Sequence, residues 1–189
     1  MKILNLCYAL GVTALALTGS LKADTILATD AMWTVTGGTS NLTTGVSYKA
    51  AFGYSSDSLY SYNTYWAPGS GAVPSYLNIS TTIDLSGYDL PTVQYSFAID
   101  NDATIYVNGM QIAHLIHEGA ASWTSFATLT NATSGLNQID VVAVDRGGAS
   151  FFDLTVRGTQ HVPDAGSTLI MLGASLLGLV GLRRRLLRI

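Results

Sequence analysis

Apart from its amino-terminal end, this chain has no cysteine. The only one, Cys7, lies within the first 20 residues. The rest of the protein therefore has no disulfide framework, thiol nucleophile or thiolate metal site. Basic residues are also scarce in the middle of the chain, because six of the nine lie in its two ends. Residues 24–160 keep three basic and eleven acidic residues, a net charge of −8, which excludes nucleic acid and anionic lipid as expected partners.

Recognisable catalytic motifs are missing as well. The sequence contains no G-x-S-x-G nucleophile elbow, no H-E-x-x-H zinc motif and no phosphate-binding loop. A glycoside hydrolase needs a pair of carboxylates that flank a cleft, and the eleven acidic residues of this region, only one of them glutamate, do not reveal such a pair. We therefore expect a protein that is not an enzyme. A polysaccharide-active hydrolase or lyase without a legible motif is the alternative from another class.

The amino-terminal end has the features of an export signal. Lys2 precedes an apolar segment at residues 3–17, and small residues up to Ala23 offer a cleavage site. The apolar segment is too short for a membrane-spanning helix. We expect residues 1–23 to be a signal peptide that signal peptidase removes.

The carboxyl-terminal end, residues 161–189, combines three features in order. A short motif at 162–167 is followed by an uncharged apolar run at 168–182 and by an arginine-rich end at 183–189. Apolar residues partition into the bilayer, and arginines hold the adjacent end of a helix on the cytoplasmic side. We therefore expect a transmembrane helix at 168–182. The residues that define these features are Val162, Pro163, Asp164 and Gly166 in the motif, and Arg183, Arg184 and Arg185 after the helix.

This order of elements resembles the carboxyl-terminal sorting signals of the PEP-CTERM class, and most closely the variant that opens with V-P-D-S-G. Ala165 stands where that variant has serine. The resemblance implies a bacterial protein that is exported and transiently anchored in the cytoplasmic membrane. It also implies processing by an exosortase, a membrane cysteine protease, followed by delivery to the cell surface or an extracellular matrix.

The middle of the chain, residues 24–160, is predicted to be one all-β domain. Apolar residues alternate with polar ones at 77–83 and 93–99, and Gly, Ser, Thr and Asn separate the short candidate strands. Asn108-Gly109 is typical of a tight type I′ hairpin turn. We expect an antiparallel β-sandwich in which the strands at 137–144 and 151–157 are neighbours, with Trp33 and Trp123 in the core.

The succession of segments at 97–109, 123–129, 135–144 and 147–158 resembles the galactose-binding-like jelly roll. That fold occurs in PEP-CTERM proteins and in accessory domains of carbohydrate-active enzymes. The resemblance implies a jelly-roll β-sandwich that binds carbohydrate or forms part of an extracellular matrix. A purely structural matrix protein without a ligand is a further alternative.

Aromatic residues concentrate between positions 52 and 66, directly before a loop predicted at 67–74. Exposed rings stack on the C–H groups of sugars, and most such rings in a β-protein also serve in packing. Tyr65 and Trp66 are the predicted ligand-binding residues because they stand at the edge of the loop. The acidity of the domain favours a neutral polysaccharide over an acidic one.

Asp100-Asn101-Asp102 is the one place where oxygen ligands for a metal ion cluster in the sequence. Asp100 and Asp102 could bind calcium, which accepts carboxylates in flexible geometry. A β-turn in which the aspartate side chains cap the backbone explains the same residues and is favoured. No other cofactor is expected.

Overall fold

The computed structural model describes residues 23–28, 31–55, 62–117, 122–160 and 173. Up to Gln160 the described backbone forms eleven β-strands and one short 3-10 helix, which confirms the all-β prediction. The elements are β1 (Asp24–Leu27), β2 (Met32–Gly38), β3 (Ser47–Lys49), β4 (Phe52–Tyr54), β5 (Thr64–Tyr65), β6 (Ser75–Asp84), η2 (Leu90–Thr92), β7 (Gln94–Val107), β8 (Met110–His117), β9 (Ala127–Thr128), β10 (Leu136–Asp145) and β11 (Ser150–Gly158).

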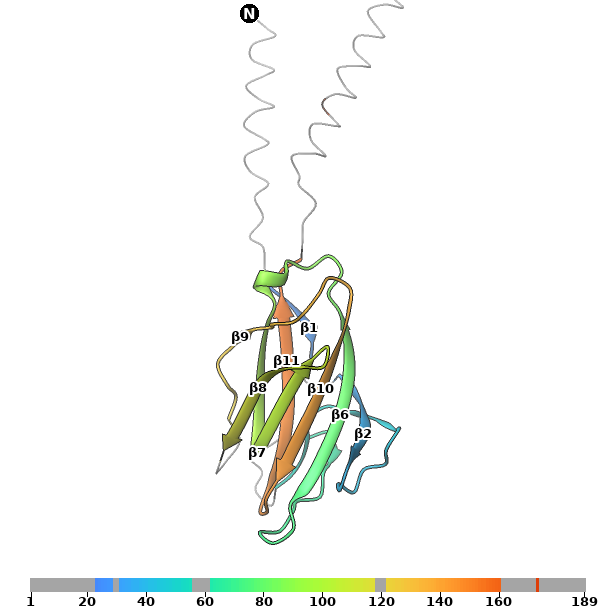
Figure 1. Ribbon diagram of the computed structural model, residues 1–189, viewed down its shortest axis with the longest axis vertical. Helices are drawn as coiled ribbons and strands as arrows, with labels where there is room; N and C mark the ends of the chain where they lie inside the picture. The colour runs from blue at the N-terminus through green and yellow to red at the C-terminus, as the bar shows by residue number, and fades with distance from the viewer. Residues whose placement is uncertain (1–22, 29–30, 56–61, 118–121, 161–172, 174–189) are drawn as a thin grey trace, which may run out of the picture.

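The strands form two sheets that share β7 (Figure 1). Sheet A consists of β9, the first half of β7, β11, β1, β4 and β5, whereas sheet B consists of β8, the second half of β7, β10, β6, β2 and β3. Residues 94–100 of β7 pair with β11, and residues 102–107 pair with β10. One long strand therefore connects the two layers, and the described pairs are antiparallel apart from β4 with β5.

The core lies between the two sheets. The alternating residues predicted at 93–99 are all buried, and so are Leu77, Ile79 and Ile83 of β6. Trp33 of β2 meets Phe152 of β11 edge to face, with ring centroids 6.1 Å apart, so this contact joins sheet B to sheet A. Trp33 is fully buried, as predicted. A core of large apolar side chains is what stabilises this domain without disulfides.

The hairpin predicted at Asn108-Gly109 is present between β7 and β8. Both residues have positive φ, 51° at Asn108 and 78° at Gly109, as a type I′ turn requires. The Asn108 side chain also donates hydrogen bonds to the backbone oxygen of Asn131 and to Oδ1 of Asn137. The turn is therefore fixed to the loop before β10.

Three expectations for the domain are wrong. β10 and β11 are not neighbours, because β7 lies between them in the sheet order. Asp100-Asn101-Asp102 is not a turn: it lies inside β7, where the strand passes from sheet A to sheet B. Trp123 is not in the core, since 47% of its surface is exposed.

The two ends of the domain lie side by side. Asp24 at the start of β1 pairs with Gly158 at the end of β11. Ser150, at the other end of β11, lies at the opposite end of the sandwich, near the β5–β6 loop and the β10–β11 turn (Figure 1). The loops at that second end are thus far from Asp24 and Gly158.

In the described part of the chain, no helix has the length and apolar character to span a membrane. The predicted signal peptide at 1–23 and the predicted transmembrane helix at 168–182 lie outside the described residues, apart from Ala23 and Gly173.

Candidate functional site

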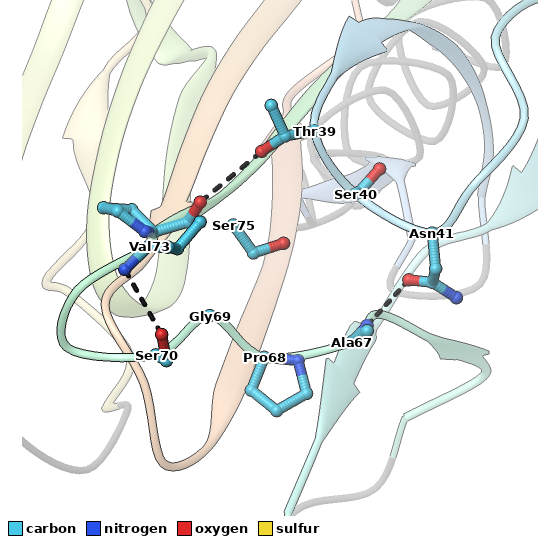
Figure 2. Close-up of a pocket in the computed structure, with 10 residues that line it drawn as sticks. Thr39, Ser40, Asn41, Ala67, Pro68, Gly69, Ser70, Val73 and Ser75 are labelled. Carbon is cyan, nitrogen blue, oxygen red and sulfur yellow. Dashed lines mark hydrogen bonds between the residues drawn. The ribbon is translucent and has the colours of Figure 1, made fainter.

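A pocket of about 430 Å³ opens at the end of the sandwich that lies away from Asp24 and Gly158. Figure 2 shows it between the segment after β2 and the loop that leads into β6. Side chains with hydroxyl or amide groups and small apolar residues line it, and none of the lining residues is charged. They are Thr39, Ser40, Asn41, Ala67, Pro68, Gly69, Ser70, Val73, Pro74 and Ser75.

Asn41 holds the two walls of the pocket together. Its Oδ1 accepts a hydrogen bond from the backbone N–H of Ala67 at 2.7 Å, and its Nδ2 donates to the backbone oxygen of Tyr65 at 3.3 Å (Figure 2 shows the first). The opposite side is closed by Thr39, whose Oγ1 accepts from the N–H of Tyr76 and donates to the Pro74 oxygen. The pocket is therefore shaped before any ligand arrives, which lowers the entropy cost of binding.

The Asp145 side chain holds the pocket loop in position. Its Oδ2 accepts hydrogen bonds from the backbone N–H groups of Gly69 and Gly147, so it ties the pocket loop to the β10–β11 turn. Burial raises the pKa of Asp145, while these two N–H donors act in the opposite direction. Gly69 is required here, because a Cβ would lie 2.5 Å from the backbone oxygen of Asp145. Asp145 is fully buried and does not line the pocket, so its role is to position the loop.

The chemistry available in this pocket is hydrogen bonding without charge. Hydroxyl groups, one carboxamide and backbone groups can exchange hydrogen bonds with hydroxyl groups of a ligand. No lining residue is an acid or a base that titrates near neutral pH, so the pocket contains no general acid–base pair. The arrangement is suited to binding a polar, uncharged molecule.

Tyr65 and Trp66, the two predicted ligand-binding residues, differ in their positions. Tyr65 is 49% exposed, and its ring packs edge to face against Tyr54 with centroids 5.6 Å apart. Trp66 is completely buried, and its indole N–H donates to the Ser75 hydroxyl at 3.0 Å. The prediction of an accessible ring at Trp66 is therefore wrong. Adjacent residues in extended backbone point to opposite sides, and here Tyr65 points to solvent while Trp66 points into the core.

Asp100 and Asp102, the predicted calcium ligands, form contacts within the protein. Asp102 pairs with the Arg146 guanidinium, and the backbone N–H of Arg146 donates to Oδ1 of Asn101. Asp100 accepts a hydrogen bond from the Asn101 side chain, and the peptide bond between these two residues is cis. Among the described residues no group of three or more His, Cys, Asp or Glu side chains is placed to hold a metal ion.

The sequence predicted the loop at 67–74 but not that it meets residues 39–41. Residues 39–41 and 67–75 are more than 24 positions apart, and Asp145 lies 76 positions beyond Gly69. No local pattern marks Asn41 as the residue that joins the walls. The predicted sorting residues Val162, Pro163, Asp164, Gly166, Arg183, Arg184 and Arg185 lie outside the described residues.

Comparison with known proteins identifies the carboxyl-terminal end. Residues 161–186 match the model of the VPDSG-CTERM motif, which supports the predicted class of sorting signal. No curated protein matches the chain.

Two solved structures are similar in part. One is the PA14 domain of the antifreeze protein MpAFP, with 22% identity and a TM-score of 0.38 over 50% of this chain and 46% of that one. The other is the PA14 sugar-binding domain of an RTX adhesin, with 19% identity and a TM-score of 0.34 over 51% of this chain and 50% of that one. The chain thus spans about half the length of each of these structures.

Proposed function

We propose that this chain is an exported, surface-sorted protein that is not an enzyme, and that its domain binds a neutral polysaccharide at the pocket beside Tyr65. One observation carries the proposal: the pocket is lined by uncharged residues with hydroxyl, amide and backbone groups, and its lining residue Asn41 is hydrogen-bonded to the backbone of the exposed Tyr65. Sugars require these two kinds of contact, hydrogen bonds for their hydroxyl groups and a ring face for their C–H groups.

The electrostatics of the domain favour a neutral ligand at this pocket. Residues 24–160 carry a net charge of −8, and no basic side chain lines the pocket to offset it. A single shallow site of this kind binds weakly. Many copies on a cell surface or in a matrix would raise the overall affinity through multivalency, without any new contact.

The same proposal includes the type of β-sandwich. We describe the sandwich as a galactose-binding-like jelly roll, because the order of its segments in the sequence resembles that family. No calcium ion is needed for the proposed pocket. Asp100 is engaged by the Asn101 side chain and Asp102 by Arg146.

Binding of a neutral polysaccharide is expected to depend on Tyr65. Tyr65→Ala in the full-length protein should reduce retention on an affinity column of a neutral polysaccharide about fivefold, since one stacked ring contributes roughly 1 kcal/mol. The control is Met110→Ala, which removes an exposed apolar side chain of β8 that belongs to neither proposed binding surface. Equal retention of both variants and the parent would remove Tyr65 from the site. A parent protein that is not retained by any neutral polysaccharide would leave a structural matrix role.

The proposed sorting route predicts a shortened mature protein. An exosortase-type enzyme would cut near residues 162–167, so material released to the cell surface should lack the segment beyond about Gly166. Intact-mass measurement of extracellular protein decides this point, and a mass that includes Arg183 to Ile189 would contradict it. The double variant Pro163→Ala, Asp164→Ala should stay in the membrane fraction at full length, whereas Ala165→Ser, which restores the serine of the motif, should be processed normally.

A further inference from the structure

A second surface with the character of a binding site lies on the outer face of sheet A. We call it the outer platform, and it consists of Trp123, Phe126 and Arg157. Trp123 is 47% exposed and Phe126 is 39% exposed. The Arg157 guanidinium lies over the Phe126 ring, 3.5 Å from its centroid. The platform shares no residue with the pocket described above.

The strand register places all three side chains on the same face. Trp123 forms a bridge with Ala98 of β7, and Phe97 and Ile99 on either side of Ala98 point into the core. Directly opposed residues of antiparallel strands project to the same side, so Trp123 points outward with Ala98. Arg157 of β11 is paired with Gln94 of β7, an even number of positions from Ala98, so it projects to the same face.

The segment that carries the two rings is held firmly against β7. The Thr124 N–H donates to the Phe97 oxygen at 2.8 Å, and the Phe97 N–H donates to the Thr124 hydroxyl at 3.1 Å. The Ser96 hydroxyl also donates to the Thr124 oxygen at 2.7 Å. These bonds fix the backbone between the two rings, so a ligand would not have to order it on binding.

The Arg157 guanidinium has N–H groups that no described acceptor uses, and it has no acidic partner among the described residues. Its Nη2 and Nε donate to Oε1 of Gln94, at 3.0 and 3.3 Å, which uses one edge of the guanidinium. No carboxylate of the described residues lies within ion-pair distance of it. Asp100 and Asp153, the acidic residues of the paired β7 and β11 segments, are themselves buried. The second edge of the guanidinium can therefore donate two parallel hydrogen bonds to the carboxylate of a ligand.

The spacing of the platform matches a chain ligand rather than a single small molecule. Ala98 and Gln94, the strand neighbours of Trp123 and Arg157, are four residues apart on β7, which is roughly 13 Å. A short oligosaccharide covers such a distance. One of its rings would stack on Trp123, while a carboxylate farther along the chain would reach Arg157.

We propose that the outer platform binds an acidic, uronate-containing polysaccharide, with a sugar ring on Trp123 and a carboxylate on Arg157. This site goes beyond the neutral-polysaccharide pocket and does not depend on it. The net charge of −8 opposes acidic ligands at long range, but salt screens exposed charges beyond about 8 Å. At contact distance Arg157, which has no ion-pair partner among the described residues, dominates. The two sites would let one domain bridge a neutral and an acidic matrix polymer.

The test is retention of the full-length protein on immobilised alginate, a polymer of uronates, and on carboxyl-reduced alginate, its neutral counterpart. We expect alginate to retain the parent more strongly than its carboxyl-reduced counterpart does. Arg157→Gln should weaken retention at least about tenfold and Trp123→Ala severalfold, because they remove the charge-assisted pair and the stacked ring. Arg157→Lys keeps the charge without the bidentate geometry and should retain part of the binding. Tyr65→Ala is the matched control and should be retained like the parent.

The outcomes separate this proposal from the proposed function. Unchanged retention of both Arg157→Gln and Trp123→Ala on alginate would overturn it, as would a parent that alginate does not retain. Retention of the parent by carboxyl-reduced alginate that is the same in both variants belongs to the pocket and not to the platform. Loss of alginate binding in Tyr65→Ala would move the site to the pocket and overturn it as well. Far-ultraviolet circular dichroism and thermal midpoints of all variants show whether each is folded. If Arg157→Gln does not fold, Arg157→Lys and Trp123→Ala still decide the question.

Discussion

Asp153→Asn is expected to make this protein more stable at neutral and alkaline pH. Asp153 lies in β11 opposite Ala98 and is only 4% exposed. Its burial raises its pKa from 3.8 to about 7, and the one hydrogen bond to its carboxylate, from the Leu154 N–H, acts in the opposite direction without offsetting the effect of burial. Asparagine has the same shape and can accept the same hydrogen bond without ever becoming charged.

The direction of the pH dependence follows from this raised pKa. Between about pH 4 and pH 7 the folded state holds the Asp153 proton more tightly than the unfolded state, so stability falls as the pH rises through this range. Above pH 7 the carboxylate is charged in both states and the full cost of burying it remains. The advantage of Asp153→Asn should therefore be absent at pH 4, grow up to pH 7 and then stay constant, at about 2–4 kcal/mol.

Urea unfolding of the parent and the variant between pH 4 and pH 9 measures this difference. Asp84→Asn is the control, because the pKa of the exposed Asp84 is lowered by a hydrogen bond from the Ser86 N–H. Because its lowered pKa keeps Asp84 ionised in the folded state throughout this range, the difference between that variant and the parent should stay nearly constant from pH 4 to pH 9. A difference between Asp153→Asn and the parent that does not change with pH would show that Asp153 is not buried as a proton-binding group.

Trp66→Ala is expected to cause the largest loss of stability, about 3–5 kcal/mol. Trp66 is completely buried, and its removal leaves a cavity. The Ser75 hydroxyl, which is almost fully buried, would also lose the hydrogen bond that it accepts from the indole N–H. The backbone oxygen of Trp66 accepts a hydrogen bond from the Ser150 hydroxyl at 2.6 Å, a contact to β11 that the variant keeps, so the expected loss comes from the indole alone.

Tyr65→Ala, one position earlier, should change stability by less than about 1 kcal/mol, because half of its ring is exposed. Chemical denaturation of the two variants compares adjacent aromatic residues in the same segment. Trp66→Phe should fall between them, since it keeps most of the volume and loses only the N–H donor. A Trp66→Ala variant as stable as Tyr65→Ala would contradict the burial of the indole.

The sequence alone determined the features that depend on local patterns. Alternation of apolar residues at 93–99 predicted the buried face of β7, and Asn108-Gly109 predicted the hairpin turn, because side-chain period and φ preference are properties of neighbouring residues. The order of motif, apolar run and arginines predicted the sorting signal that the match to residues 161–186 supports. Export and processing are read from linear segments, so no tertiary structure is needed to recognise them.

Only the tertiary structure decided which aromatic rings are buried and where binding surfaces form. Trp66 is completely buried and hydrogen-bonded to Ser75 and Ser150, whereas Trp123 forms an isolated bridge with Ala98 and is 47% exposed. Asp100-Asn101-Asp102 has the composition of a turn, yet the pairing of β7 with both β10 and β11 keeps it extended. The pocket and the outer platform each combine residues from distant parts of the chain. Contacts between such residues depend on strand register and sheet packing, which a local pattern does not specify.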